Sequence, residues 1–178
     1  MKYFIHFLTY FRVFLAPIIF LLITVYDSYS LVLFLFILAS ISDYWDGFLA
    51  RKYNLESMIG AVLDPIADKI LVTFLILALS IELSSVYVGM AGGLILARDF
   101  WVGALRDFNA RQGASDATKV IMLAKIKTSI QFLTFSSYLI GLVMNNSIIL
   151  FISDFLLFLA LIATLKTGLS YSLETFKK

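Results

Sequence analysis

The sequence contains no cysteine and a single histidine, His6, among its 178 residues. The absence of thiols excludes disulfide bonds and thiolate metal sites, and one histidine is too few for the usual zinc site. Charged side chains make up only 15% of the chain, and the net charge of +2 is too small to indicate a nucleic-acid-binding surface. The chain therefore lacks the features of a disulfide-rich, zinc-binding or nucleic-acid-binding protein.

Apolar residues, in contrast, make up 61% of the sequence, and the mean hydropathy is +0.96. Soluble domains contain roughly 45–50% apolar residues, whereas a membrane-spanning helix needs about 20 that are mostly apolar. Six such helices with short turns use nearly the whole chain, so the sequence predicts one all-α integral membrane domain over residues 1–178. We expect an interfacial amphipathic helix at 1–11 and spans near 12–26, 30–52, 57–81, 86–110, 118–143 and 148–167.

The basic residues gather on one side of the predicted spans. The turns "YDSYS", "ELSSV" and "MNNS" contain Asp27 and Glu82 but no lysine or arginine. Because cytoplasmic loops of membrane proteins are enriched in lysine and arginine, both termini are predicted to be cytoplasmic. The basic residues assigned to this side are Lys2, Arg12, Arg51, Lys52, Arg111, Lys119, Lys125, Lys127, Lys166, Lys177 and Lys178.

Four aspartates interrupt the apolar pattern in "SDYWDGFLARKYNLESMIGAVLDPIADK", residues 42–69. Asp43 and Asp46 share one face of the second predicted span, and Asp64 and Asp68 share one face of the third. With a rise of about 1.5 Å per residue, two antiparallel spans bring all four carboxylates to a similar depth on the cytoplasmic side. The sequence therefore predicts that two acidic faces meet across a common pocket.

Four ionised carboxylates at this depth repel one another, and the nearby cations Arg51 and Lys69 are too few to neutralise them. Oxygen ligands without cysteine or histidine suit two hard divalent cations, Mg²⁺ or Mn²⁺, arranged to hold a phosphoryl group. A proton or sodium pathway is the alternative. The acidic faces also carry the small residues Gly47, Ala50 and Gly60, which leave room for a ligand, and Arg51 is placed to contact a phosphate.

These residues form the pattern Asp43-x2-Asp46-Gly47-x2-Ala50-Arg51-x8-Gly60-x3-Asp64-x3-Asp68. The pattern resembles the signature of the CDP-alcohol phosphotransferase family at all eight specified positions. The resemblance implies a six-helix membrane enzyme with two bound divalent cations. It also implies transfer of a phosphatidyl or other substituted phosphoryl group from a CDP-linked donor to an acceptor hydroxyl, with release of CMP.

The resemblance also assigns roles to individual residues. It implies that Asp68 is both a metal ligand and the general base that takes the proton of the acceptor hydroxyl. The other metal ligands that it implies are Asp43, Asp46 and Asp64. The residues implied to hold the CDP group are Asp43, Gly47, Ala50, Arg51 and Gly60.

Four basic residues outside this pattern are candidates for binding a phosphate group on the acceptor. They are Arg98, Arg106, Lys125 and Lys127. Arg98 and Arg106 are eight residues apart, hence on roughly one face of the fourth predicted span. Positive charge on the cytoplasmic side, with Asp99 and Asp107 as partners, is the simpler interpretation. Arg98 fits it poorly, because burying an arginine so deep in a span is costly.

The same stretches resemble the branch of the family that forms phosphatidylglycerophosphate in bacteria, from about residue 8 to residue 131. "LTYFRVFLAP" matches its Leu-Thr-x-x-Arg-x-x-Leu-x-Pro pattern, and three later segments match except for Asp99 and Asp107 in place of Glu and Ala124 in place of Gly. This resemblance implies CDP-diacylglycerol as donor and sn-glycerol 3-phosphate as acceptor. It also implies a homodimer in the inner (cytoplasmic) membrane of a bacterium, with the active site facing the cytoplasm.

Two alternative functions remain open. A cardiolipin synthase of the same superfamily would use phosphatidylglycerol as acceptor and would have less need of Arg98 and Arg106. A cation or proton transporter would have acidic sites or broken helices near the midplane with access to both sides, and only Pro65 is a candidate break near the acids. Asp154 in the sixth predicted span has no role in these interpretations, and a polar contact or a shifted helix boundary is the simplest explanation for it.

Overall fold

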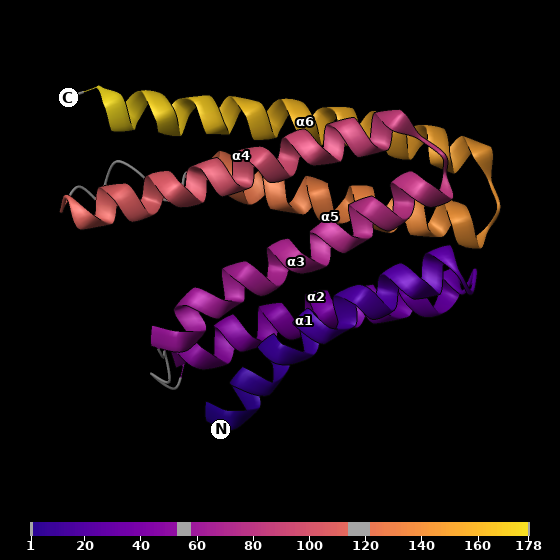
Figure 1. Ribbon diagram of the computed structural model, residues 1–178, viewed down its shortest axis with the longest axis horizontal. Coiled ribbons are helices and arrows are strands. Elements are labelled where there is room, and N and C mark those ends of the chain that lie inside the picture. The colour runs from indigo at the N-terminus through magenta and orange to yellow at the C-terminus, as the bar shows by residue number, and fades with distance from the viewer. Residues whose placement is uncertain (1, 53–57, 114–121, 178) are drawn as a thin grey trace. The chain divides into compact units, whose positions relative to one another are not determined.

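The computed structural model describes residues 2–52, 58–113 and 122–177, and among these the side chains of residues 9–42, 45, 63–113 and 127–177. In these ranges the chain forms α-helices and no β-strand (Figure 1). The helices are α1 (Lys2–Thr24), α2 (Tyr29–Lys52), α3 (Met58–Glu82), α4 (Val86–Arg111), α5 (Met122–Val143) and α6 (Ser147–Phe176). The predicted all-α fold class is therefore confirmed.

The helices form two compact units. The first unit, Met1–Ser85, contains α1 to α3, and the second, Val86–Lys178, contains α4 to α6. Within each unit, successive helices alternate in direction (Figure 1). The single membrane domain expected over the whole chain stays a prediction.

Two helices differ from the boundaries that the sequence predicts. α1 is one helix, Lys2–Thr24, with no end at residue 11, where the interfacial helix is expected to stop. The charge that suggests a boundary there belongs to Arg12, and it is neutralised by carboxylates within the same unit. α6 continues to Phe176 rather than ending near residue 167, because its buried face extends through Tyr171 and Thr175.

The three short turns expected from the sequence are present. Each contains one non-glycine residue in the left-handed conformation, namely Asp27 (φ 50°), Ser84 (φ 47°) and Asn145 (φ 46°). Asp and Asn adopt this conformation more readily than most residues. Asn146 then caps α6, because its side-chain oxygen accepts a hydrogen bond from the backbone N–H of Ile148 at 2.9 Å.

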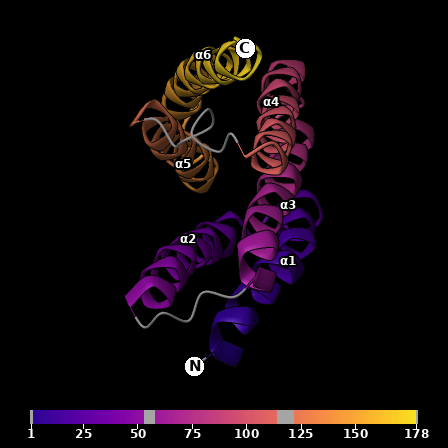
Figure 2. The ribbon, with the colours of Figure 1, turned by 90° about the vertical axis from the view of Figure 1, so that its left-hand side faces the viewer.

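In the first unit, α1 packs against both α3 and α2, and its place beside α3 can be followed in Figure 2. In the described part of the chain, α2 and α3 are not a closely packed pair. The acidic pocket expected between the second and third spans stays a prediction, because the side chains of Asp43 and Asp46 lie outside the described residues. The buried apolar residues recur at helical spacing, with Leu15, Ala16, Ile19 and Ile23 on α1 and Ala67, Leu71, Leu75 and Leu79 on α3.

In the second unit, α6 packs against both α5 and α4. Its buried residues recur every three or four positions, and most have small or hydroxyl-bearing side chains. Such residues let helices approach closely, and they are typical of helix contacts within membranes. The buried residues of α6 are Ser153, Leu157, Ala160, Thr164, Thr167, Gly168, Tyr171 and Thr175.

Asp154 of α6 is the point where polar side chains of all three helices of the second unit meet. The hydroxyl of Tyr138 donates a hydrogen bond to Asp154 Oδ1 at 2.6 Å, and the hydroxyl of Tyr87 donates one to the Asp154 carbonyl oxygen at 3.1 Å. Next to it, Ser153 Oγ donates to Ser137 Oγ at 2.7 Å. A polar group in an apolar helix needs such partners, so the polar contact expected for Asp154 is confirmed.

The outer faces of the helices carry many exposed apolar side chains. On α6 these include Phe151, Phe155, Phe158 and Leu165. By length and composition, α4 and α6 are each able to cross a membrane. Large contiguous apolar surfaces are rare on soluble monomers, so the exposed faces agree with a membrane environment. The number of spans and the cytoplasmic location of the termini stay predictions.

The contact between α5 and α6 leaves no space for a side chain at Gly141. A Cβ atom added there would lie 2.7 Å from Leu150 Cδ2 and 3.3 Å from the Leu150 backbone nitrogen. Gly141→Ala is therefore expected to lower the free energy of unfolding by about 1–3 kcal/mol. Gly93→Ala is the matched control, because a Cβ atom there would have no neighbour within 4 Å. Thermal unfolding in detergent measures both, and equal midpoints for the two variants would contradict the tight contact.

Candidate active site

Asp64 and Asp68 of α3 converge on one arginine of α1. Arg12 Nη1 donates a hydrogen bond to Asp68 Oδ1 at 2.5 Å, and Arg12 Nη2 donates one to Asp64 Oδ1 at 3.2 Å. Thr9, almost one turn before Arg12, donates from Oγ1 to Asp64 Oδ1 at 2.6 Å. The two carboxylates therefore share one face of α3, as the sequence predicts, and both reach α1.

The guanidinium group is buried, whereas the two carboxylates remain accessible. The side chain of Arg12 is 1% exposed, that of Asp64 is 35% exposed and that of Asp68 is 50% exposed. A buried arginine is costly unless it is paired, and these two carboxylates supply the pairing. Both carboxylates are partly exposed, and ionised carboxylate oxygens attract cations.

The side-chain oxygen atoms around Arg12 are of the kind that bind a hard divalent cation. They are oxygen atoms of carboxylates and a hydroxyl, the ligands that Mg²⁺ and Mn²⁺ prefer. Convergence of both carboxylates on the cationic Arg12 shows that α3 presents them together to positive charge. In the part of the chain whose side chains are placed, no three acidic or histidine side chains gather at one point. The other two predicted metal ligands, Asp43 and Asp46, lie outside the part of the chain whose side chains are described.

Several predicted site residues lie outside the part of the chain whose side chains the structure describes. Their positions on the helices are known, but their roles and the expected meeting of the two acidic faces stay predictions. They are Asp43, Asp46, Gly47, Ala50 and Arg51 on α2, Gly60 on α3 and Lys125 on α5.

Arg98 of α4 lies inside the second unit with only 10% of its side chain exposed. Its Nη1 donates a hydrogen bond to Asp99 Oδ1 at 2.9 Å, and its Nη2 donates one to Thr167 Oγ1 of α6 at 2.6 Å. Nε has no hydrogen-bond partner among the residues that the structure describes. Nε is itself buried, whereas a guanidinium group in general suits the oxygens of an anion.

Two further predicted basic residues belong to the same group. Lys127 of α5 forms an ion pair with Asp99, so Asp99 contacts Arg98 and Lys127 at once. Cζ of Arg106 lies 5.6 Å from the centre of the Tyr171 ring, and Cζ of Arg98 lies 5.8 Å from the same centre. The structure thus brings together three of the four residues expected to bind a phosphate. Asp99 pairs with Arg98 and Lys127, as the simpler interpretation predicts for Asp99, and one carboxylate offsets only one of these two positive charges.

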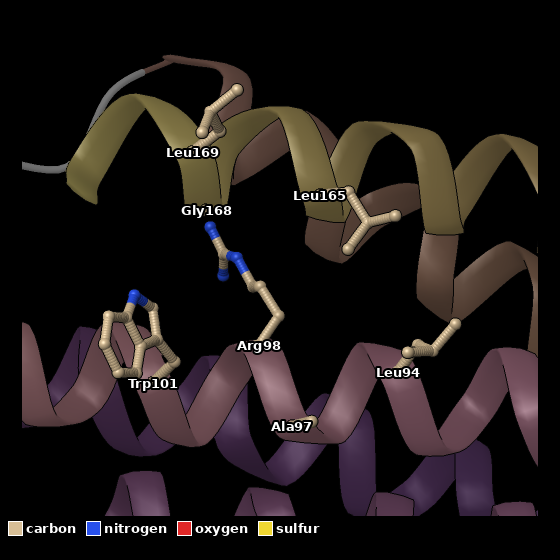
Figure 3. Close-up of a pocket in the computed structure, with 7 residues that line it drawn as sticks. All are labelled: Leu94, Ala97, Arg98, Trp101, Leu165, Gly168 and Leu169. Atoms are coloured by element: carbon tan, nitrogen blue, oxygen red, sulfur yellow. The ribbon is translucent and has the colours of Figure 1, made fainter. Parts of the chain in front are cut away.

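A pocket of about 310 Å³ lies beside Arg98, between α4 and α6. Arg98 extends from α4 toward Gly168 of α6, and Trp101 lies beside it (Figure 3). The remaining wall of the pocket is apolar and consists of Leu94, Ala97, Leu165 and Leu169. Arg98, paired with Asp99, is therefore the charged residue of an otherwise apolar recess.

Two contacts of these groups go beyond the sequence predictions. By sequence, Arg12 belongs to the basic residues of the cytoplasmic side, whereas in the structure it holds Asp64 and Asp68. The available signal is an arginine inside an apolar run, three residues after Thr9. Tyr171 lies on the helix in which the sequence shows no motif, and nothing in its local pattern indicates a contact with arginine.

The chain matches a known protein family over a region that includes both Arg12 and Arg98. The family profile described as CDP-alcohol phosphatidyltransferase matches residues 5–166. The chain belongs to this family. The match includes Arg12, Asp64, Asp68, Arg98 and Lys127, and it ends just before Thr167. Membership of the CDP-alcohol phosphatidyltransferase family confirms the resemblance identified from the eight-residue pattern.

Individual relatives within the family are similar over most of their length. CDP-diacylglycerol–glycerol-3-phosphate 3-phosphatidyltransferase of Rickettsia typhi is 38% identical over 174 residues, which cover 96% of each chain. The protein of the same name from Rickettsia bellii is 38% identical over 169 residues, 93% of this chain and 91% of the relative. That of Shigella flexneri is 32% identical over 167 residues, 92% of this chain and 90% of the relative.

Arg12→Gln removes the guanidinium that Asp64 and Asp68 share. Breaking a fully buried ion pair costs about 3–5 kcal/mol, and the exposed carboxylates reduce this to about 2 kcal/mol in the free energy of unfolding. Thermal unfolding in detergent measures the loss, with Arg111→Gln as the control because Arg111 is exposed. An Arg12→Gln midpoint equal to that of Arg111→Gln would show that the ion pairs contribute nothing to stability.

Proposed function

We propose that this protein transfers the phosphatidyl group of CDP-diacylglycerol to sn-glycerol 3-phosphate, giving phosphatidylglycerophosphate and CMP. The observation that carries the proposal is the similarity to the Rickettsia typhi enzyme over 96% of both chains. The name of that relative specifies both the donor and the acceptor. Two groups of side chains agree with this activity. The acidic group, Asp64 and Asp68 with Arg12, suits a cation, and the basic group, Arg98, Arg106 and Lys127, suits an anion.

The acidic group supports the transfer step. Asp64 and Asp68, with Asp43 and Asp46 as the remaining proposed ligands, would hold two divalent cations, Mg²⁺ or Mn²⁺. When bound, these cations offset the negative charge of the donor's diphosphate and of the transition state. Arg12 holds Asp64 and Asp68 through their Oδ1 atoms, and both carboxylates remain partly exposed.

Asp68 is the proposed general base. Half of its side chain is exposed, and Oδ1 accepts the hydrogen bond from Arg12. The primary hydroxyl of the acceptor loses its proton to Asp68 while its oxygen forms a bond to the phosphatidyl phosphorus. The bond between that phosphorus and the oxygen of CMP breaks, and CMP leaves. Gly47, Ala50, Arg51 and Gly60, together with Asp43, are proposed to hold the CDP part of the donor.

The basic group is proposed to bind the phosphate of the acceptor. Arg98, Arg106 and Lys127 lie in one group that retains two positive charges after pairing with Asp99. A phosphate monoester carries about two negative charges near neutral pH, so the charges match. Lys125, on the same helix as Lys127, is the fourth proposed contact.

We propose that the protein is a homodimer in the inner membrane of a bacterium, with six membrane-spanning helices and both termini in the cytoplasm. The one-sided distribution of lysine and arginine supports this orientation. The length and apolar composition of α4 and α6 support membrane insertion. A site facing the cytoplasm gives direct access to a water-soluble acceptor.

The choice of acceptor is tested with purified protein, CDP-diacylglycerol and labelled acceptors. Label is expected to enter lipid from glycerol 3-phosphate, with one CMP released per transfer, and not from serine or inositol phosphate. EDTA is expected to abolish the transfer and Mg²⁺ or Mn²⁺ to restore it, because the carboxylates need a counter-charge. Label entering lipid from phosphatidylglycerol instead would assign the protein as a cardiolipin synthase.

The role of Asp68 is tested by Asp68→Asn, which keeps the size of the side chain but removes the base. Since general base catalysis contributes about 10²- to 10⁴-fold, kcat is expected to fall by at least about 100-fold. Asp107→Asn is the control, because Asp107 is exposed and lies outside both groups. An Asp68→Asn variant that binds Mn²⁺ normally by calorimetry and turns over at the parental rate would remove Asp68 as the base.

A further inference from the structure

The last part of α6 contacts the arginines of the basic group, although it lies beyond the end of the family profile. The family profile ends at residue 166. Thr167, Gly168 and Tyr171 follow directly, and each of them lies against Arg98. These three residues are therefore candidates for a role that the family match does not assign.

Thr167 and Gly168 fix the path of the Arg98 side chain. Thr167 Oγ1 lies 2.9 Å from the Ala163 carbonyl oxygen of its own helix, to which it donates, and it accepts the hydrogen bond from Arg98 Nη2. A Cβ atom added to Gly168 would lie 2.8 Å from Arg98 Cγ and 3.1 Å from Arg98 Nε. The space left by the missing side chain of Gly168 is thus filled by Arg98 (Figure 3).

Tyr171 contacts both arginines of the basic group, Arg98 and Arg106. Its side chain is fully buried, and the guanidinium carbons of Arg98 and Arg106 lie 5.8 Å and 5.6 Å from its ring centre. The face of an aromatic ring attracts cations at this distance. One ring therefore partly offsets the repulsion between two like charges and holds both of them on the α4 side of α6.

We propose that Gly168 and Tyr171 are positioning residues that set the geometry of Arg98 and Arg106 for the acceptor's phosphate. The inference rests on the proposed function and deepens it. Neither residue touches the substrate in this scheme, so they are not catalytic residues. Affinity for a small anion depends on how well its cationic partners are held before binding. Displacing either arginine therefore weakens recognition of the phosphate and leaves recognition of the CDP-linked donor unchanged.

The chemical group that this geometry suits is a phosphate monoester, such as that of the proposed acceptor. Two guanidinium groups supply several parallel N–H donors, which match the oxygens of a phosphate. Inorganic phosphate shares this chemistry and serves as a probe that needs no turnover. It is expected to compete with the acceptor and not with the donor.

The experiment compares Gly168→Ala and Tyr171→Leu with wild-type protein, in the acceptor assay with both substrates varied. Each variant is expected to raise the KM for glycerol 3-phosphate by about 3- to 10-fold, the size of a cation–π contact or a displaced charged hydrogen bond. The KM for CDP-diacylglycerol and kcat are expected to change by less than about twofold, because the acidic group is not altered. The inhibition constant of inorganic phosphate is expected to rise in proportion to the KM for glycerol 3-phosphate.

Matched variants separate positioning from a general loss of packing. Gly93→Ala adds a methyl group where no neighbour lies within 4 Å, and Gly141→Ala adds one against Leu150. Gly93→Ala is expected to match wild type, and Gly141→Ala is expected to unfold at a lower temperature with an unchanged KM for glycerol 3-phosphate. Tyr171→Phe keeps the aromatic ring and is expected to restore most of the affinity that Tyr171→Leu loses.

The outcomes distinguish this inference from the proposed function. A wild-type protein that does not label lipid from glycerol 3-phosphate overturns the proposed function, and the inference falls with it. Normal wild-type turnover with an unchanged KM in Gly168→Ala overturns the inference alone. The same holds if Gly168→Ala raises the KM values for donor and acceptor equally. Gly168→Ala is the smaller change and decides the question if Tyr171→Leu does not fold.

Discussion

The pairing of charge inside apolar helices is the constraint on which the functional groups of this protein depend. Arg12 is almost fully buried and is held by Asp64 and Asp68, and Arg98 is nine-tenths buried and is held by Asp99. An unpaired charge at either place would cost several kcal/mol, of order 3–5. The pairs therefore select the rotation of α1 relative to α3 and orient the side chains of α4, while apolar contacts supply most of the packing.

The two units carry opposite charge in their polar groups, and this division matches the two halves of the proposed reaction. In the first unit, two partly exposed carboxylates exceed the charge of one guanidinium. In the second, three basic side chains exceed the charge of Asp99. The first group is suited to hold cations against a diphosphate and the second to hold a phosphate monoester. Each group is built from helices of one unit, so each has its own local support.

The sequence predicts the helices and the shared face of Asp64 and Asp68 because both follow from local spacing. A helix with a residue every 100° places positions i and i+4 on one side, whatever packs against it. It does not predict that Arg12 pairs with those aspartates, because the partners are 52 and 56 residues apart and helices that are apolar all round show no preferred face. The contacts of Tyr171 with the arginines cannot be predicted from the sequence for a similar reason. An aromatic residue in an apolar helix cannot be told by sequence from one that only packs in the core.

The separation of Arg12 from its carboxylates has a consequence for biosynthesis. A ribosome releases α1 first, and at that moment the aspartates of α3 have not yet been made. A buried arginine without its carboxylate partners is costly, and this cost falls only when the third helix arrives. In the proposed topology, the first helix therefore becomes stably seated in the membrane together with the third, so the first three helices insert as one cooperative group.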